Sequence, residues 1–181
     1  MPQPAPPVLQ IPAGWHPVQA DLDLWVTDSF SFLAQPANFR GQLQAAKTVS
    51  GFTLMQLDTI LEDPYGGWSA TTTANQPAFS WLCPAGCSGW YEATLSGFTA
   101  SQGAGTTNQV ATALYLNGSI WQDGSDDWAP ASAVAGSPGA VAVPLRAGFD
   151  YVQLYVSSSA SVSTPATAGE YPAMELNWVS S

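Results

Sequence analysis

The chain has 181 residues, and its 3 basic against 13 acidic side chains give a formal net charge of −10. This charge excludes nucleic-acid binding, which depends on Lys and Arg neutralising phosphates, and it disfavours an anionic membrane surface. The length fits one domain, and 46% hydrophobic residues suffice for a sizeable core. With only 9% charged residues, the surface is suited to contact other proteins or glycans.

Residues 1–18 are rich in proline and lack helical or strand periodicity, which predicts an extended, polyproline-like arm. This start has neither the basic beginning nor the apolar run of a signal peptide, and the chain has no stretch of about 18 apolar residues. We therefore expect no export through this segment and no membrane insertion. The apolar residues of the arm either attach it to another protein or pack it on this chain's own domain; they are Val8, Leu9, Ile11 and Trp15.

Residues 19–38 are expected to form one short amphipathic helix and a connector. Apolar residues recur at three- and four-residue steps from Ala20 to Leu33, and Pro36 ends the pattern. A helix of this length is marginal alone, so its apolar stripe must pack on this chain's own domain or on the same helix in neighbouring subunits. The second alternative makes the stripe part of an oligomer interface, formed by Leu22, Trp25 and Phe30.

From residue 39 to residue 181 the pattern is all β, because apolar and β-branched residues alternate with polar ones between Gly, Asn, Pro and Ser. Asn117-Gly118 is the sharpest turn signal, since both central residues of a type I′ turn need positive φ. The number and spacing of the strands predict a two-sheet antiparallel jelly roll. The candidate strands are 39–48, 52–62, 68–73, 78–82, 89–99, 108–117, 119–122, 140–145, 149–157 and 172–179.

Several motifs follow one another in this β region. They are Leu57 to Trp68, Pro84 with Gly89-Trp90-Tyr91, Leu114 to Gly118, Leu145 to Val152, and Met174 to Val179. Their order resembles the globular head of the first complement component and the tumour-necrosis-factor-like jelly roll. In that family a strand enters through Pro-x-x-Gly-x-Tyr, a later strand ends in Leu-x-x-Asn-Gly, and another begins Leu-x-x-Gly-Asp-x-Val. The resemblance implies a homotrimeric head domain.

The candidate strand 149–157 has apolar residues on both faces. A strand of this kind is commonly buried on both faces. Since one face of a jelly-roll sheet covers its own core, we expect the aromatic face to meet another subunit. Its interface residues are Phe149, Tyr151 and Tyr155.

Cys83 and Cys87 bracket a short Pro-Ala-Gly segment. Two cysteines cannot complete a four-ligand zinc site, and the sole histidine, His16, lies far away in sequence. The pair is therefore either two buried thiols or a short-loop disulfide formed in an oxidising medium.

The residues needed for catalysis are not found as a recognisable constellation. His16 lies in the arm without triad partners, and the chain has no Gly-x-Ser-x-Gly elbow, phosphate-binding glycine loop or His-Glu-x-x-His motif. Glu62, Asp63 and Glu92 could act as paired carboxylates, but acidic residues before a turn commonly make local hydrogen bonds. We expect a protein that is not an enzyme and has neither cofactor nor metal.

The segment from Trp121 to Trp128 is the best candidate for a binding loop. Its aromatic faces could stack on the apolar patches of sugar rings. Its carboxylates could accept hydrogen bonds from sugar hydroxyls or bind Ca²⁺, although their spacing is not that of an EF-hand. A solvated acidic turn, or tryptophans packed in a core or interface, are the alternatives. The candidate ligand-binding residues are Trp121, Asp123, Asp126, Asp127 and Trp128.

The stretch from Trp25 to Leu33, placed ahead of a jelly roll, resembles minor tail proteins of phages that infect actinobacteria. The resemblance implies a virion protein, assembled in the host cytoplasm, that forms a tail-tip or tail-fibre head for host attachment. Its partners would be itself, other virion proteins through the arm, and host cell-wall glycan. A capsid decoration protein and a secreted carbohydrate-binding module are the alternatives.

Overall fold

The computed structural model describes residues 37–99, 107–130, 135–136, 139–165 and 170–180. The predicted arm and the predicted helix lie outside the described residues. The residues concerned are Val8, Leu9, Ile11, Trp15, Leu22, Trp25 and Phe30. Within the described ranges, no helix is long and apolar enough to cross a membrane.

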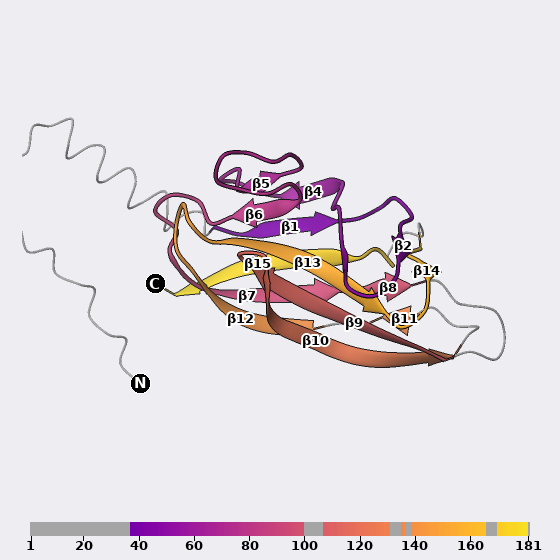
Figure 1. Ribbon diagram of the computed structural model, residues 1–181. Coiled ribbons are helices and arrows are strands. Elements are labelled where there is room, and N and C mark those ends of the chain that lie inside the picture. The colour runs from indigo at the N-terminus through magenta and orange to yellow at the C-terminus, as the bar shows by residue number, and fades with distance from the viewer. Residues whose placement is uncertain (1–36, 100–106, 131–134, 137–138, 166–169, 181) are drawn as a thin grey trace, which may run out of the picture. The chain divides into compact units, whose positions relative to one another are not determined.

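The described chain consists of short and medium-length strands (Figure 1). In chain order they are β1 (Phe39–Gln42), β2 (Thr48–Val49), β3 (Thr53–Leu54), β4 (Thr59–Glu62), β5 (Trp68–Ser69), β6 (Ser80–Leu82), β7 (Gly89–Ser96), β8 (Phe98–Thr99), β9 (Thr107–Leu116), β10 (Ser119–Pro130), β11 (Ala135–Gly136), β12 (Gly139–Leu145), β13 (Tyr151–Ser158), β14 (Val162–Ser163) and β15 (Ala173–Ser180).

Two antiparallel sheets face each other. The five-stranded sheet has the order β12-β7-β15-β1-β4, and the six-stranded sheet has the order β10-β9-β13-β6-β5, with β3 also paired to β13. Two small ladders, β11 with β8 and β14 with β2, lie together at one end of the sandwich, on the right in Figure 1. The predicted two-sheet antiparallel jelly roll is confirmed.

Alternation along the strands places the core between the sheets. Tyr91, Ala93 and Leu95 of β7 are buried while the residues between them are exposed. On β13 Val152, Leu154 and Val156 are buried on the core face, while on the opposite face the two tyrosines are half-buried and Gln153 is buried. Large aromatic side chains fill the centre: the ring of Trp81 lies 6.2 Å from that of Phe39 and 5.6 Å from that of Tyr91.

The predicted hairpin at Asn117-Gly118 is confirmed. Asn117 has φ 51° and Gly118 has φ 80°, and Ser119 pairs with Leu116 directly after the turn. This turn connects the two longest strands of the six-stranded sheet.

Several predicted strand boundaries were wrong. The candidate 39–48 divides into β1 and β2, because the Asp58 carboxylate accepts hydrogen bonds from the N–H groups of Gln44 (2.9 Å) and Ala45 (3.0 Å), which leave the ladder there. The candidate 52–62 divides into β3 and β4 around the same aspartate. The candidate 149–157 begins only at Tyr151.

Three loops and both ends of the described domain gather at one end of the sandwich. The loops connect β6 to β7, β9 to β10, and β12 to β13, and backbone hydrogen bonds join them. Phe39 at the start of β1 pairs with Leu176 of β15, and Ser180 at the end of β15 pairs with Trp90, just after the loop that connects β6 to β7. This end contains a polar network formed by Asn117, Arg146 and Asp150.

Candidate functional site

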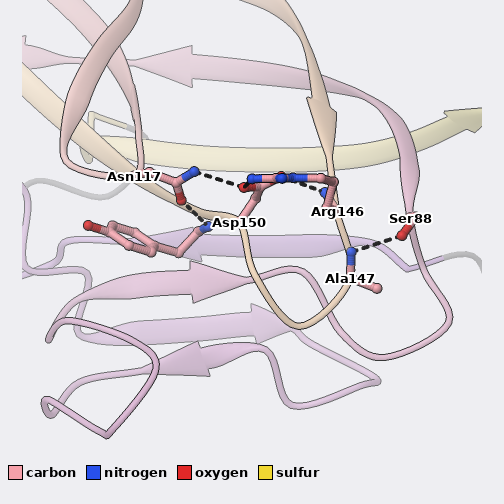
Figure 2. A network of polar contacts seen from close by, with 6 residues as sticks. Ser88, Asn117, Arg146, Ala147 and Asp150 are labelled. Carbon is pink, nitrogen blue, oxygen red and sulfur yellow. Dashed lines mark hydrogen bonds and ion pairs between the residues drawn. The ribbon is translucent and has the colours of Figure 1, made fainter.

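Arg146, Asp150 and Asn117 form a network that joins two loops of this end (Figure 2). The guanidinium of Arg146 donates from Nε and Nη2 to the two carboxylate oxygens of Asp150, each at 3.0 Å. Asn117 donates from Nδ2 to the same carboxylate at 2.8 Å and accepts from the Tyr151 N–H at 3.0 Å. The hydrogen bond from Arg146 outweighs the burial of the carboxyl and lowers the pKa of Asp150 to about 2.

The loop between β12 and β13 is braced on the loop between β6 and β7. Gly148 donates to the carbonyl of Cys83 at 2.7 Å, and Ala147 donates to the hydroxyl oxygen of Ser88 at 2.9 Å (Figure 2). At the tip of this braced loop, Phe149 is 75% exposed. Phe149 was predicted on one strand face with the tyrosines, but it lies in a turn, because its N–H and that of Asp150 bond to the carbonyl of Arg146.

Cys83 and Cys87 are free, buried thiols beneath these loops. The Cys83 thiol and the Tyr91 hydroxyl both donate to the carbonyl of Cys87, at 3.3 Å and 2.6 Å. Burial raises the pKa of Cys83 to about 11 and also raises the pKa of Cys87, so both stay protonated at neutral pH. The structure therefore agrees with two buried thiols and not with a short-loop disulfide.

The carboxylates considered for glycoside hydrolysis are not brought together. Asp63 accepts from the N–H groups of Gly67 (3.0 Å) and Trp68 (2.8 Å), the local role expected of an acidic residue before a turn. Glu62 on β4 and Glu92 on β7 are separated by β1 and β15, so their backbones lie roughly 14 Å apart. Among the described residues, no group of three His, Cys, Asp or Glu side chains could hold a metal ion.

The predicted binding loop from Trp121 to Trp128 is a strand. β10 pairs with β9 as far as Pro130, with irregularities of register between Ile120 and Gln122 and between Asp123 and Asp126. An extended segment places Trp121 and Trp128 roughly 20 Å apart instead of across one turn. The side chains of Asp123, Asp126, Asp127 and Trp128 lie outside the described part, so the ligand-binding role stays a prediction.

Trp121 itself connects the two sheets. It is 44% exposed, and its Nε1–H donates to the carbonyl of Ala142 on β12 at 3.0 Å. β10 and β12 are edge strands of opposite sheets, so this bond closes one side of the sandwich.

A cluster of aromatic side chains covers the outer surface of the six-stranded sheet. Tyr155 stacks on Tyr115 with ring centroids 3.8 Å apart, and Phe52 meets Tyr115 edge-on at 6.3 Å. Tyr151 lies two register positions before Gln153 on the same face, where the loop residue Ala78 accepts a hydrogen bond from Gln153. The cluster, called the tyrosine face below, consists of Phe52, Tyr115, Tyr151 and Tyr155.

The strands of the two sheets differ in charge. Strands β3, β5, β6, β9 and β13 of the six-stranded sheet contain no Asp, Glu, Lys or Arg, whereas the edge strand β10 contains Asp123, Asp126 and Asp127, whose side chains lie outside the described part. The outer surface of the five-stranded sheet instead carries charged residues on four strands: Arg40, Glu62, Glu92 and Glu175. Arg40 and Glu175 form an exposed ion pair at 4.0 Å.

Sequence reasoning missed three parts of this arrangement. The pairing of Arg146 with Asp150 has a local signal, a rare cation four residues before a carboxylate. Trp90 has a local signal as a surface residue, since its place beside the buried Tyr91 predicts an outward side chain. The contact of Tyr115 with Tyr155 depends on the pairing of β9 with β13 and has no local signal.

Comparison with solved structures identifies the type of fold. No family model matches the chain, and no curated protein matches its sequence. Among solved structures, the globular domain of zebrafish complement 1qA protein is similar over 79% of this chain and 96% of its own, with 10% identity and a TM-score of 0.53. Murine APRIL is similar over 77% of this chain and 97% of its own, with 8% identity and a TM-score of 0.50. The chain has the complement-head type of jelly-roll fold.

Proposed function

We propose that this chain is a non-enzymatic structural protein of a phage particle, in which it self-associates as a homotrimer and presents its jelly-roll head for host attachment. The resemblance of Trp25 to Leu33 to phage minor tail proteins and the small number of charged residues support the virion assignment. The similarity to solved structures supports the fold of the head.

The observation that carries the self-association is the uncharged tyrosine face. Subunit contacts are depleted of charge and enriched in aromatic residues at their centre, since burying an unpaired charge costs several kcal/mol. The stacked rings of Tyr115 and Tyr155 hold each other in place, so little side-chain freedom is lost when a second surface covers them. The predicted interface residues Tyr151 and Tyr155 lie on this face.

Immunogold labelling of intact particles of the phage that encodes the chain tests the virion role. Label at the tail tip is expected. Label over the capsid would instead favour a decoration protein, and particles that carry no label would contradict the proposal.

A further inference from the structure

Two exposed tryptophans lie on the side of the sandwich where the edges of both sheets meet. Trp90 of β7 is 49% exposed and Trp121 of β10 is 44% exposed. Neither belongs to the tyrosine face, whose tyrosines lie on β9 and β13 of the six-stranded sheet. Single exposed apolar side chains are common, but large ones that gather on one side of a domain can mark a contact site.

The strand register places polar side chains beside Trp90. Pro144 of β12 pairs with Trp90, and two register positions further, on the same face, Ala142 pairs with Glu92. Glu92 in turn pairs with Asn177 of β15. Exposed and buried residues alternate along β7 and β12, so Trp90, Glu92 and Ala142 all face outward.

Trp121 borders the same row of residues from the opposite sheet. Its indole N–H is bonded to the carbonyl of Ala142, so the edge of the ring is fixed against β12. The exposed part of the side chain is therefore apolar ring surface.

The backbone beneath Trp90 is also held tightly. Gly89 has φ 157°, and a Cβ at this position would lie 2.3 Å from the carbonyl oxygen of Ser180. Only glycine lets β15 approach this closely. The side chain of Trp90 thus starts from a fixed position in the sheet.

The chemistry of these side chains matches that of a sugar. A pyranose ring has an apolar C–H face that stacks on an indole, and a rim of hydroxyls that donate hydrogen bonds to carboxylates. Glu92 is exposed on β7, so its carboxylate is accessible as a hydrogen-bond acceptor. Asn177 donates from Nδ2 to Glu175 at 3.1 Å, which leaves its amide oxygen as a second acceptor.

Charge restricts the class of glycan. Glu92 and Glu175 lie on this surface, and the whole chain has a net charge of −10. An anionic polymer such as a phosphate-rich wall polysaccharide would be repelled. A neutral polysaccharide or an N-acetylated amino-sugar chain would not.

We propose that Trp90, Trp121, Glu92 and Asn177 form a binding surface for an uncharged glycan. The proposal names a ligand class for the proposed role in host attachment, and it rests on that role. It also replaces the predicted pairing of Trp121 with Trp128, which β10 holds apart. Trp121 keeps its predicted role, with Trp90 as its partner.

Calorimetric titration of the full chain tests the surface, with chitohexaose as the amino-sugar probe and cellohexaose as the neutral probe. Binding to at least one probe is expected, and Trp90→Ala or Trp121→Ala should each weaken it about tenfold or more, as loss of a central aromatic contact does. Phe149→Ala removes an aromatic group that is even more exposed and lies elsewhere, and it should leave the affinity unchanged.

Glu92→Thr provides a second test that does not depend on removing a large side chain. Thr suits an exposed strand position, and loss of the carboxylate should weaken binding about fivefold. The proposal is overturned if the native chain binds neither probe at millimolar concentration, or if Glu92→Thr and both tryptophan variants bind as the native chain does. It is equally overturned if the tryptophan variants change the oligomer mass, because these residues would then be interface residues. Any of these results leaves the particle labelling unaffected.

Discussion

Tyr115 of β9 and Tyr155 of β13 stack with their ring centroids 3.8 Å apart and their planes inclined by 22°. Antiparallel pairing of β9 with β13 brings the rings together: Tyr115 pairs with Gln153, and Tyr155 pairs with Ala113. The pair forms the centre of the tyrosine face, on which the proposed self-association depends.

Tyr155→Glu should therefore dissociate the assembly without unfolding the subunit. A carboxylate buried in a dry contact costs roughly several kcal/mol per subunit. Sedimentation velocity should show a monomer with a far-ultraviolet circular dichroism spectrum like that of the native chain. Ala140→Glu, at an exposed position of the five-stranded sheet, is the control and should leave the assembly intact. The reverse pattern would place the interface on the five-stranded sheet.

Asp150→Asn should lower the free energy of unfolding by about 2 kcal/mol at neutral pH. The pKa of Asp150 is lowered from 3.8 to about 2 in the folded chain, so its contribution is complete above pH 3.8. It is lost as the pH falls toward 2. Urea unfolding from pH 7 to pH 2 should show the difference between the native chain and the variant shrinking over the lower part of this range. A constant difference would mean that Arg146 does not stabilise the ionised carboxylate.

Gly118→Ala should destabilise the domain by about 1 to 2 kcal/mol, because Gly118 has φ 80° and L residues are strained there. Gly66→Ala is a matched control, since Gly66 has φ 66° and a Cβ there would meet nothing within 4 Å. A Cβ at Gly118 would lie 3.2 Å from the Tyr151 hydroxyl. Thermal unfolding should therefore show a larger loss for Gly118→Ala than for Gly66→Ala, and equal losses would argue against a contact at this turn.

The two thiols should resist labelling in the folded chain. Cys83 and Cys87 are buried, and burial raises the pKa of Cys83 to about 11, which disfavours the reactive thiolate. A maleimide reagent at pH 8 should label both residues in urea and neither in native buffer over the same time. An unfolded chain that is labelled only after treatment with a reductant would reveal a disulfide instead.

Local patterns were sufficient for the framework of this fold. The alternation in β7 and the Asn117-Gly118 turn each depend on residues adjacent in sequence, and both are found as predicted. The prediction of a loop from Trp121 to Trp128 is wrong, although Asp and Gly are typical turn residues. An edge strand tolerates them, and the irregular register around Gly124 accommodates them within β10.

The candidate sites depend on contacts between distant parts of the chain. Asn117 and Asp150 are 33 residues apart, and their hydrogen bond exists only because the turn after β9 meets the loop before β13. Trp121 and Ala142 meet across the two sheets in the same way. Single-sequence periodicity assigns the face of a side chain but not its neighbour on the next strand.

Light scattering of the unmodified full chain tests the self-association most directly. At micromolar concentration we expect a single species with three times the chain mass of 18.9 kDa. A monodisperse species with the mass of one chain would contradict the proposed assembly.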